Sequence, residues 1–337
     1  MTAGAAQHKP TIAIAIGDPA GIGPEISLKA ARDPGVRALC RPVLVGDPAV
    51  LERHAKACGL PADFHILDEF DATDGSGDHL LLLACRSNEA DIAFGSTSAA
   101  SGRISLAAAR AAIHAALNGK VDAVVAAPQN QTSIALAGIE FDGYPSFVAR
   151  ETGLDPRDVY LMLCFDDVRI VHCTLHVGVK EAVALITRER VSHVIGVADG
   201  TLRRLGIADP KIYVSGLNPH AGEGGLFGRE EIDIIQPAIE AAAARGIRVS
   251  GPFGADTMFH KTDGDAFIVM LHDQGHITAK LLARRATAGL AIGSPILFSS
   301  VAHGSGHDIV GRGMADPTAM IQAIGRLAQA SARRPQG

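Results

Sequence analysis

Short apolar runs alternate with longer helical patterns along nearly the whole chain, and this alternation constrains the fold more than any other feature. The first run, Thr11–Ile16, has the composition of a buried strand, and Pro24 then opens a helix at a favourable position. Pro42–Val45 is a second expected strand, after which Asp47 should cap a helix that has Pro48 in its first turn. This pattern predicts an α/β fold with mainly parallel sheets and helices on both faces.

The later part of the chain shows the same alternation of strands and helices. Ser105 is expected to cap a long alanine-rich helix that ends at Asn118 and Gly119. Five further apolar runs have the length of strands: Ala123–Ala126, Arg169–Leu175, Lys211–Ser215, Arg248–Ser250 and Phe267–Leu271. The polar segment 71–78 has the composition of a disordered loop. No repeat or low-complexity linker divides the chain, so any division into domains must come from topology.

Composition excludes several classes of protein. The 337 residues are 47% hydrophobic, which is enough for one large core or two moderate ones. A net charge of −5 without a long basic stretch argues against a nucleic-acid partner. No run approaches the ~20 apolar residues of a membrane span, and the N-terminus lacks an apolar signal core. Five cysteines without CxxC spacing fit a reducing compartment. We therefore expect a soluble cytoplasmic protein with no membrane partner.

Three histidines follow the carboxyl ends of expected strands, namely His176, His220 and His272. Ligands gather at this edge of parallel sheets, and three imidazoles can hold a catalytic zinc ion with one position open. With 14 histidines in the chain, chance placement is an equal alternative from the pattern alone. His172 is expected to pack within the sheet, whereas His276 could add a ligand if its segment is helical.

The glycine-rich segment Gly17–Glu25 lies between a strand and a helix, where phosphates are often bound. It is neither a GxGxxG turn nor a P-loop, and a tight connection without a ligand explains it equally well.

Five motifs resemble the 4-hydroxythreonine-4-phosphate dehydrogenase family in order and spacing. They are GDPAGIGPE (17–25), AAPQN (126–130), GLNPHAGEGG (216–225), GADT (254–257) and LHDQG (271–275), and the resemblance extends from Thr11 to about Ile321. That family is similar to the isocitrate and isopropylmalate dehydrogenases, and His303–Pro317 resembles their adenine-binding loop. The resemblance implies a two-domain fold, with residues 1–126 plus 285–337 on the nucleotide side and 127–284 on the substrate, metal and dimerisation side. It also implies an active site in the interdomain cleft at the interface of a homodimer.

The same resemblance implies roles for individual residues. The metal ligands fall on His176, His220 and His272, and His272 is expected to complete the site from the neighbouring chain, with zinc as the expected metal. The catalytic group comprises Lys280 with Asp256 and Asp273; Lys280 either relays a proton or contacts a substrate carboxylate. The expected NAD-binding residues are His303, Gly304, Ser305, Asp308 and Gly311.

The chain departs from the phosphate-using members of the family at several positions. Tyr144 and Pro145 stand where those members have a His-Thr pair, and Gln131, Gly289 and Phe298 replace a lysine, an asparagine and an arginine. Loss of an imidazole, a guanidinium and an ammonium removes most of what would hold a phosphate dianion. We therefore expect a carboxylate substrate, contacted by Tyr144, Ser146, Asn218, His276, Arg284 and Phe298.

A narrower resemblance fits these changes. GYPS, RIVHCTLH, MLHDQGH, LFSSVAHGS and DIVGRG are similar to the diol dehydrogenases of terephthalate breakdown, which act on 1,2-dihydroxy-3,5-cyclohexadiene-1,4-dicarboxylate, and to isophthalate-type relatives. It implies metal-dependent, NAD-linked oxidative decarboxylation of a cis-dihydrodiol carboxylate to a catechol carboxylate such as protocatechuate. A 4-hydroxythreonine-4-phosphate or four-carbon sugar-acid phosphate dehydrogenase, a three-histidine metallohydrolase and a non-catalytic binding protein are the alternatives.

Overall fold

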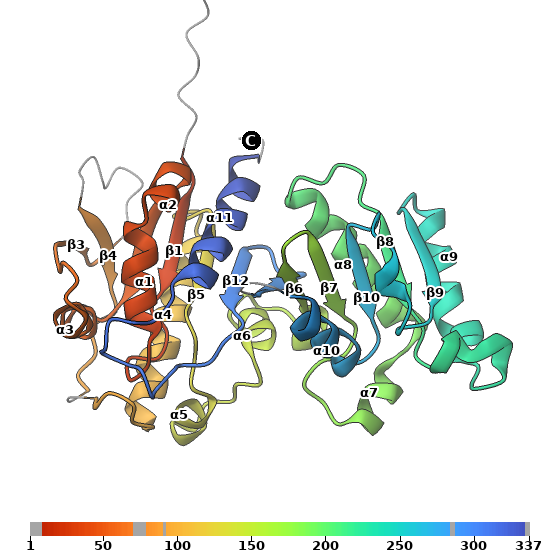
Figure 1. The fold of residues 1–337 in the computed structure, drawn as a ribbon, viewed down its shortest axis with the longest axis horizontal. Coiled ribbons are helices and arrows are strands. Elements are labelled where there is room, and N and C mark those ends of the chain that lie inside the picture. Colours follow the sequence, from red (N-terminus) through yellow and green to blue (C-terminus); the bar gives the residue numbers. More distant parts are fainter. Residues whose placement is uncertain (1–8, 70–78, 90–91, 284–286, 334–337) are drawn as a thin grey trace, which may run out of the picture. The chain divides into compact units, whose positions relative to one another are not determined.

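The computed structural model describes residues 9–69, 79–89, 92–283 and 287–333. It consists of two compact units, shown in Figure 1: unit 1 comprises Met1–Asp142 and Pro295–Gly337, and unit 2 comprises Gly143–Ser294. The segment 71–78 and Arg284, which the sequence singled out, lie outside the described residues. Among the described helices, none has the length and apolar character that a membrane span requires.

Unit 1 contains a parallel arrangement of strands in the order β3-β4-β2-β1-β5-β12. Their bounds are β1 Thr11–Ala15, β2 Arg41–Gly46, β3 Phe64–Leu67, β4 Leu80–Ala84, β5 Ala123–Ala126 and β12 Leu297–Val301. Every residue of β1 and β5 is buried, as expected for parallel strands covered on both faces. The expected strands at residues 11, 42 and 123 are confirmed.

Helices cover the strands of unit 1, with bounds α1 Gly23–Arg32, α2 Pro34–Leu39, α3 Pro48–Cys58, α4 Ala99–Leu117, α5 Gln131–Leu136 and α11 Thr318–Ala332. Helices α1, α2 and α11 pack against one another (Figure 1), while α4 packs on β1, β2 and β5. The Asp47 carboxylate accepts a hydrogen bond from the Ala49 amide, which confirms the predicted cap of α3. The predicted cap at Ser105 was wrong, because Ser98 caps α4 and Ser105 is buried inside that helix.

Unit 2 has a mixed set of strands in the order β11-β6-β7-β10-β8-β9. The bounds are β6 Tyr160–Phe165, β7 Val168–His172, β8 Ile212–Ser215, β9 Val249–Phe253, β10 Ala266–Val269 and β11 Ala288–Ile292. Neighbours among β7, β10, β8 and β9 are parallel, whereas β6 runs antiparallel to both β11 and β7. Mainly parallel sheets are therefore confirmed, with β6 as the exception.

The helices of unit 2 follow its strands and cover them. Their bounds are α6 Tyr144–Glu151, α7 Val179–Leu185, α8 Arg188–Arg204, α9 Gln236–Ala244 and α10 His272–Leu282. Short helical turns span Pro156–Asp158, Pro219–Gly225, Glu231–Ile235 and Met258–His260. Phe165, Ile170 and Phe267 of the strands form a buried core cluster together with Met258 and with Ala279 of α10.

Packing places the boundaries between the units later than 126 and 284, the positions taken from the family resemblance. Helix α5 packs against α4, so residues 127–142 belong with unit 1. Strand β11 pairs with β6 over its whole length, so residues 287–294 belong with unit 2.

Candidate active site

One edge of the unit 2 sheet collects most of the candidate residues. Strands β7, β10, β8 and β9 are parallel neighbours, so their carboxyl ends lie at the same edge. The segments that follow these strands carry His176, His272, His220 and Asp256, respectively. The topology therefore brings four side chains from distant parts of the sequence to one edge, as ligand sites of parallel sheets require.

Helix α10 begins at His272, directly after β10, and orders three of the candidates. The Gln274 side chain accepts hydrogen bonds from the Met270 and Leu271 amides and so fixes the first turn. Because His272, His276 and Lys280 are spaced by four residues, they share one face of the helix. The His272 and His276 rings stack with centroids 3.9 Å apart and an interplanar angle of 9°. The segment that carries His276 is thus helical, the condition under which it can contribute to a ligand site.

Asp273 contacts the first histidine of this face. Nδ1 of His272 lies 2.7 Å from Oδ1 of Asp273. A carboxylate at Nδ1 fixes the tautomer that leaves Nε2 free to coordinate a metal ion. This contact places Asp273 where it can orient the His272 ring.

His176 lies close to the same group, with its ring centroid 5.9 Å from that of His272. Its ring packs so closely on the backbone of Gly143 that a Cβ there would lie 3.3 Å from the ring atoms. Gly143 directly precedes α6, whose first turn carries Tyr144 and Ser146, two expected substrate residues. The Ser146 hydroxyl donates to the Gly143 carbonyl oxygen (3.0 Å).

His220 stands apart from these rings in a single chain. It lies in the turn Pro219–Gly225, where its ring contacts Phe227 at a centroid distance of 6.2 Å. Within the described part of one chain, no three His, Cys, Asp or Glu side chains gather closely enough to hold a metal ion. The accessible imidazoles suit zinc chemically, but the expected set of three does not converge within one chain.

His172 lies beneath the stacked rings and is 1% exposed, which confirms its predicted packing within the sheet. Burial lowers its pKa to about 3, and burial also lowers the pKa of His276 to about 4. Both histidines are therefore neutral at pH 7. Position 275 must be glycine, because the Nε2 atom of His172 occupies the space that a side chain there would need.

Asn218 and Phe298, two expected substrate residues, make contacts within the protein. The Asn218 side-chain nitrogen donates to Oε2 of Glu230 (2.6 Å) and to Oε2 of Glu231 (3.0 Å). Phe298 is 1% exposed in β12 of unit 1 and forms part of the core. This burial corrects the expectation that Phe298 contacts the substrate. Arg284 lies outside the described residues.

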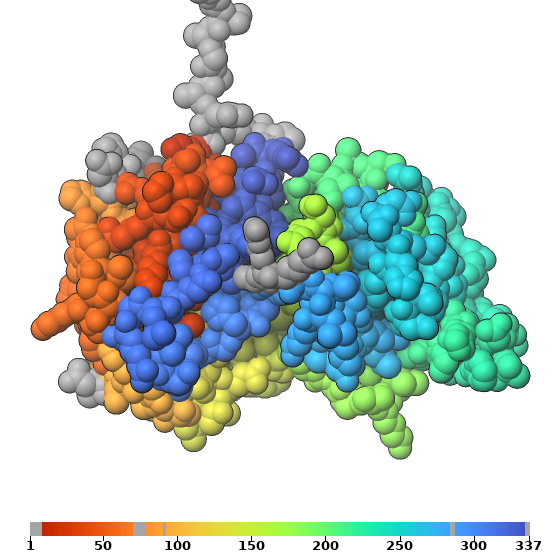
Figure 2. Space-filling view, in the orientation of Figure 1, coloured from red at the N-terminus to blue at the C-terminus, as the bar shows by residue number. Residues whose placement is uncertain are grey.

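In unit 1, the expected cofactor loop, residues 303–316, packs on the glycine-rich segment Gly17–Glu25. Figure 2 shows the blue C-terminal segment of this unit against its red N-terminal segment. The Ile22 amide donates to the Ser305 carbonyl oxygen (2.7 Å), and a Cβ on Gly21 would lie 2.5 Å from that oxygen. Gly21 is thus required by the close approach of the two segments, which explains part of the motif without a ligand.

Two residues that sequence reasoning missed join these segments. Nε2 of His307 lies 2.7 Å from Oδ2 of Asp18, whose side chain is fully buried. Oδ1 of Asp18 also accepts from the Ala20 amide (2.9 Å) and from the Ser101 hydroxyl. Both residues stand inside recognised motifs, but no local pattern pairs positions 289 residues apart.

A second buried carboxylate anchors the far end of the cofactor loop. Lys29 pairs with Glu25 (2.7 Å) and donates to the carbonyl oxygens of Gly313 and Ala315, while Glu25 accepts from the Ala315 amide. His303, Gly304 and Asp308 are exposed on the loop, whereas Ser305 is buried. Gly311 has a φ of 72° and packs against Phe94.

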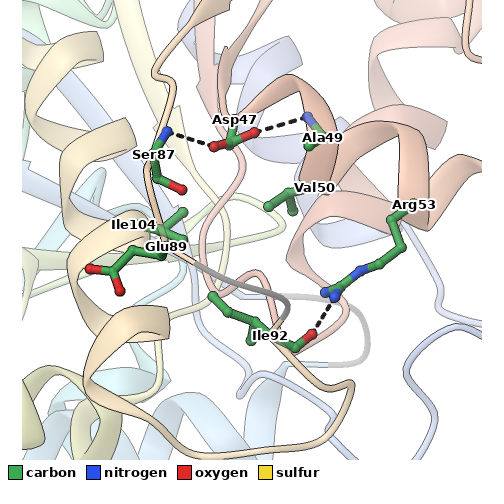
Figure 3. Close-up of a pocket in the computed structure, with 8 residues that line it drawn as sticks. All are labelled: Asp47, Ala49, Val50, Arg53, Ser87, Glu89, Ile92 and Ile104. Atoms are coloured by element: carbon green, nitrogen blue, oxygen red, sulfur yellow. Dashed lines mark hydrogen bonds between the residues drawn. The ribbon is translucent and has the colours of Figure 1, made fainter.

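A hollow of about 120 Å³ lies at the carboxyl ends of β2 and β4 (Figure 3). The Asp47 carboxylate accepts from the amides of Ala49 and Ser87, and the Arg53 guanidinium donates to the Ile92 carbonyl oxygen. Glu89 pairs with Arg103 (2.6 Å). These charged groups serve the local structure, so we do not assign the hollow to a substrate.

Comparison with known proteins decides the family. A sequence model described as "Pyridoxal phosphate biosynthetic protein PdxA" matches residues 38–327. The chain belongs to this family. It is 41% identical over 316 residues to a 1,2-dihydroxy-3,5-cyclohexadiene-1,4-dicarboxylate dehydrogenase of Comamonas sp, covering 94% of this chain and 96% of the relative. It is 36% identical over 326 residues to a 4-hydroxythreonine-4-phosphate dehydrogenase of Desulforapulum autotrophicum, covering 94% of both chains.

Solved structures agree with this assignment. A terephthalate 1,2-cis-dihydrodiol dehydrogenase from Burkholderia xenovorans LB400 matches with a TM-score of 0.70 and 42% identity, covering 95% of this chain and 98% of that one. A 4-hydroxythreonine-4-phosphate dehydrogenase from Klebsiella pneumoniae matches with a TM-score of 0.84 and 35% identity, covering 98% and 100% of the two chains. The PdxA-family chain is therefore a dehydrogenase, and the resemblance inferred from its motifs is confirmed.

Proposed function

We propose that this dehydrogenase oxidises a cyclic cis-dihydrodiol carboxylate with NAD and a divalent metal ion, and that the resulting β-keto acid loses CO₂. The product is a catechol carboxylate such as protocatechuate. The observation that carries the proposal is the shared helix face of His272, His276 and Lys280, next to His176. The name of the Comamonas relative, which specifies a cyclohexadiene dicarboxylate, supports this substrate class.

The metal ligands in this proposal are His176, His220 and His272. Because one chain does not bring the three together, a second copy of the chain supplies the missing imidazole, and the enzyme acts as a homodimer. A bound zinc-like ion would lower the pKa of a coordinated hydroxyl and stabilise the enolate formed as CO₂ leaves.

The neighbouring side chains orient and bind the substrate. Asp273 holds the His272 ring. Neutral His276 can donate a hydrogen bond to a carboxylate from Nε2 in the tautomer that gives up the contact of its Nδ1 with the His272 carbonyl oxygen (3.3 Å). Lys280, exposed one turn further along α10, either pairs with a carboxylate or accepts the hydroxyl proton. Tyr144 and Ser146 lie at the start of α6, directly after Gly143, whose backbone contacts the His176 ring. Asp256 follows β9 at the same edge and is available to orient one of these groups.

The reaction balances without a further reactant. The carbinol C–H bond would break and its hydride would pass to the bound NAD, while the hydroxyl would lose its proton and become a ketone. The bond to the adjacent carboxylate then breaks, CO₂ leaves, and the electron pair remains on the ring as an enolate. Return of the proton completes an aromatic diol, and the gain of aromaticity makes this step strongly downhill.

For NAD, we propose the exposed side of the 303–313 loop, where Gly304 and Asp308 are accessible. Two buried carboxylates hold this loop in place, and α11 follows it directly. This architecture gives a preformed surface for a dinucleotide without a GxGxxG turn.

A carboxylate substrate is favoured over a phosphate by the residues at the matched positions. Pro145, Gly289 and Phe298 offer no side-chain donor, and a phosphate dianion in a partly dry pocket needs several. The relatives named 4-hydroxythreonine-4-phosphate and D-threonate 4-phosphate dehydrogenase, at 35–38% identity, make phosphorylated hydroxy acids the second candidate class.

Steady-state kinetics of NADH formation separate the two classes. We expect a higher kcat/KM for the cis-dihydrodiols of terephthalate or isophthalate than for 4-phosphohydroxy-L-threonine or D-threonate 4-phosphate. An equal or higher value for either phosphorylated substrate would refute the carboxylate assignment. A chain that binds no nicotinamide cofactor but hydrolyses esters or amides would instead be a metallohydrolase.

A further inference from the structure

We infer that Glu231 is a positioning residue whose buried carboxylate holds a left-handed turn and thereby presents His220. This inference rests on the proposed function, because it takes His220 as a metal ligand. It adds a residue that lies outside the expected set of ligands and catalytic groups.

The turn that carries His220 has an unusual backbone. Five consecutive residues, 220–224, have φ angles between 43° and 79°. Three of them, His220, Ala221 and Glu223, are not glycine. The left-handed region is disfavoured for such residues because Cβ approaches the following carbonyl oxygen. A run of this kind persists only where surrounding contacts determine it.

Glu231 supplies those contacts from inside the turn. Its side chain belongs to a residue that is 3% exposed. Oε1 accepts hydrogen bonds from the Leu217 and Asn218 amides, both at 2.7 Å. Oε2 accepts from the Asn218 side chain (3.0 Å), and a Cβ at Gly222 would lie 2.6 Å from this oxygen. The carboxylate therefore fills the space around which the backbone bends.

Glu230 is a natural control, because it is the same residue type at the adjacent position. It also accepts from the Asn218 side chain (2.6 Å), and this bond lowers its pKa. The two backbone amides, however, donate to Glu231. Glu230 is partly exposed, so its replacement should leave the turn in place.

The chemistry links the turn to the metal site. His220 is exposed on this strained backbone, five residues after Ser215, the last residue of β8 at the sheet edge that carries the other candidates. Residues that orient a metal ligand typically change metal affinity by about 10–100-fold when replaced. A carboxylate that sets the backbone under His220 should have an effect in this range.

The test uses the full-length dimer and measures zinc affinity by competition with a chelator. We expect Glu231→Gln to weaken zinc binding by about 10-fold or more, and Glu230→Gln to stay within about twofold of the wild type. Thermal midpoint and NAD affinity are measured on the same samples. Wild-type zinc affinity in a folded Glu231→Gln protein with only a lower thermal midpoint would mean a purely structural role and overturn the inference. An equal loss in Glu230→Gln would overturn it too.

Two further variants keep the outcome clear. If Glu231→Gln does not fold, Gly222→Ala pushes on the same carboxylate and should weaken zinc binding, whereas Ala221→Gly accepts the left-handed φ and should not. His220→Ala distinguishes failure of the metal site from failure of the role assigned to Glu231. Wild-type zinc affinity in His220→Ala would refute the metal site itself. A loss in His220→Ala without a loss in Glu231→Gln or Gly222→Ala would refute only the role of Glu231.

Discussion

The two units hold their candidate functional segments in different ways. In unit 1, the loop 303–316 is bonded to Gly17–Glu25 by backbone contacts and by two fully buried carboxylates, Asp18 and Glu25. In unit 2, the candidate imidazoles His176, His220 and His272 are exposed or half-exposed, and one chain does not bring them together. Substitutions at the unit 1 anchors should therefore reduce stability first, whereas substitutions in the unit 2 group should reduce activity while the fold persists.

The largest effect is expected from His272→Ala, which removes a proposed metal ligand from the surface of unit 2. The kcat should fall by about 10³-fold, because Lewis-acid stabilisation is worth several kcal/mol. His193→Ala is the control, since that ring belongs to none of the expected ligand or catalytic sets and contacts the Tyr160 hydroxyl (2.9 Å). Steady-state kinetics with circular dichroism check both variants. Equal activity in the two would show that His272 has no part in the reaction.

In unit 1, Lys29→Met should mainly affect the free energy of unfolding. It leaves the Glu25 carboxylate, which is fully buried, without its cation and should cost on the order of 3 kcal/mol. Lys56→Met, on the exposed side of α3, should cost little. Urea denaturation measures both. A loss below about 0.5 kcal/mol for Lys29→Met would argue against the anchor, since ordinary surface substitutions lie in that range.

His54 should give unit 1 a measurable acid sensitivity. Burial lowers its pKa from 6.5 to about 4, and its Nδ1 has no hydrogen-bond partner among the described residues. Below pH 6.5 the unfolded chain binds a proton that the folded chain does not, so stability falls as pH decreases from about 6.5 to 4.

The full linkage amounts to roughly 3 kcal/mol. His54→Gln keeps a donor for the Pro19 carbonyl oxygen but cannot titrate, so its unfolding free energy should depend less on pH in this window. Parallel pH profiles for the wild type and the variant, measured by urea denaturation, would rule out this origin of the acid sensitivity.

A smaller effect is expected from Asp308→Asn on the exposed side of the cofactor loop. The KM for NAD should rise about 10-fold, since a hydrogen bond to a charged group contributes about 1.5 kcal/mol, while the KM for the organic substrate stays nearly constant. Asp63→Asn, at a surface ion pair with Arg32, is the control. If both KM values rise equally, Asp308 is not a cofactor contact.

Much of the fold could be read from the sequence where local chemistry determines it. The apolar run at Thr11 and the Asp47-Pro48 pair give a strand and a capped helix because burial and capping act within a few residues. The predicted cap at Ser105 was wrong because a serine next to an alanine-rich run resembles a cap, although the helix already begins at Ala99. Strand β6 has an apolar pattern that does not reveal its antiparallel pairing with β11, more than 100 residues later.

In the candidate site, too, some residues could be predicted from local sequence and others could not. The histidines after strands were predictable, because the carboxyl ends of parallel strands share one edge. The helix that carries His276 was left open by the sequence, and Lys280 was implied by the family resemblance. Phe298 was expected to contact the substrate, but an aromatic residue in an apolar run serves equally as core, and its burial in β12 places it in the core. The roles of Asp18, His307 and Glu231 depend on side-chain contacts across long stretches of chain, which no spacing rule encodes.

The most direct test of the account measures NAD binding and NADH formation on the same protein as zinc is removed and restored. NAD affinity should be nearly unchanged in metal-free enzyme, because the cofactor loop is held by contacts within unit 1. NADH formation from a terephthalate dihydrodiol should disappear and return at one zinc ion per active site, with an equal amount of CO₂. Full turnover by the metal-free enzyme would contradict the account.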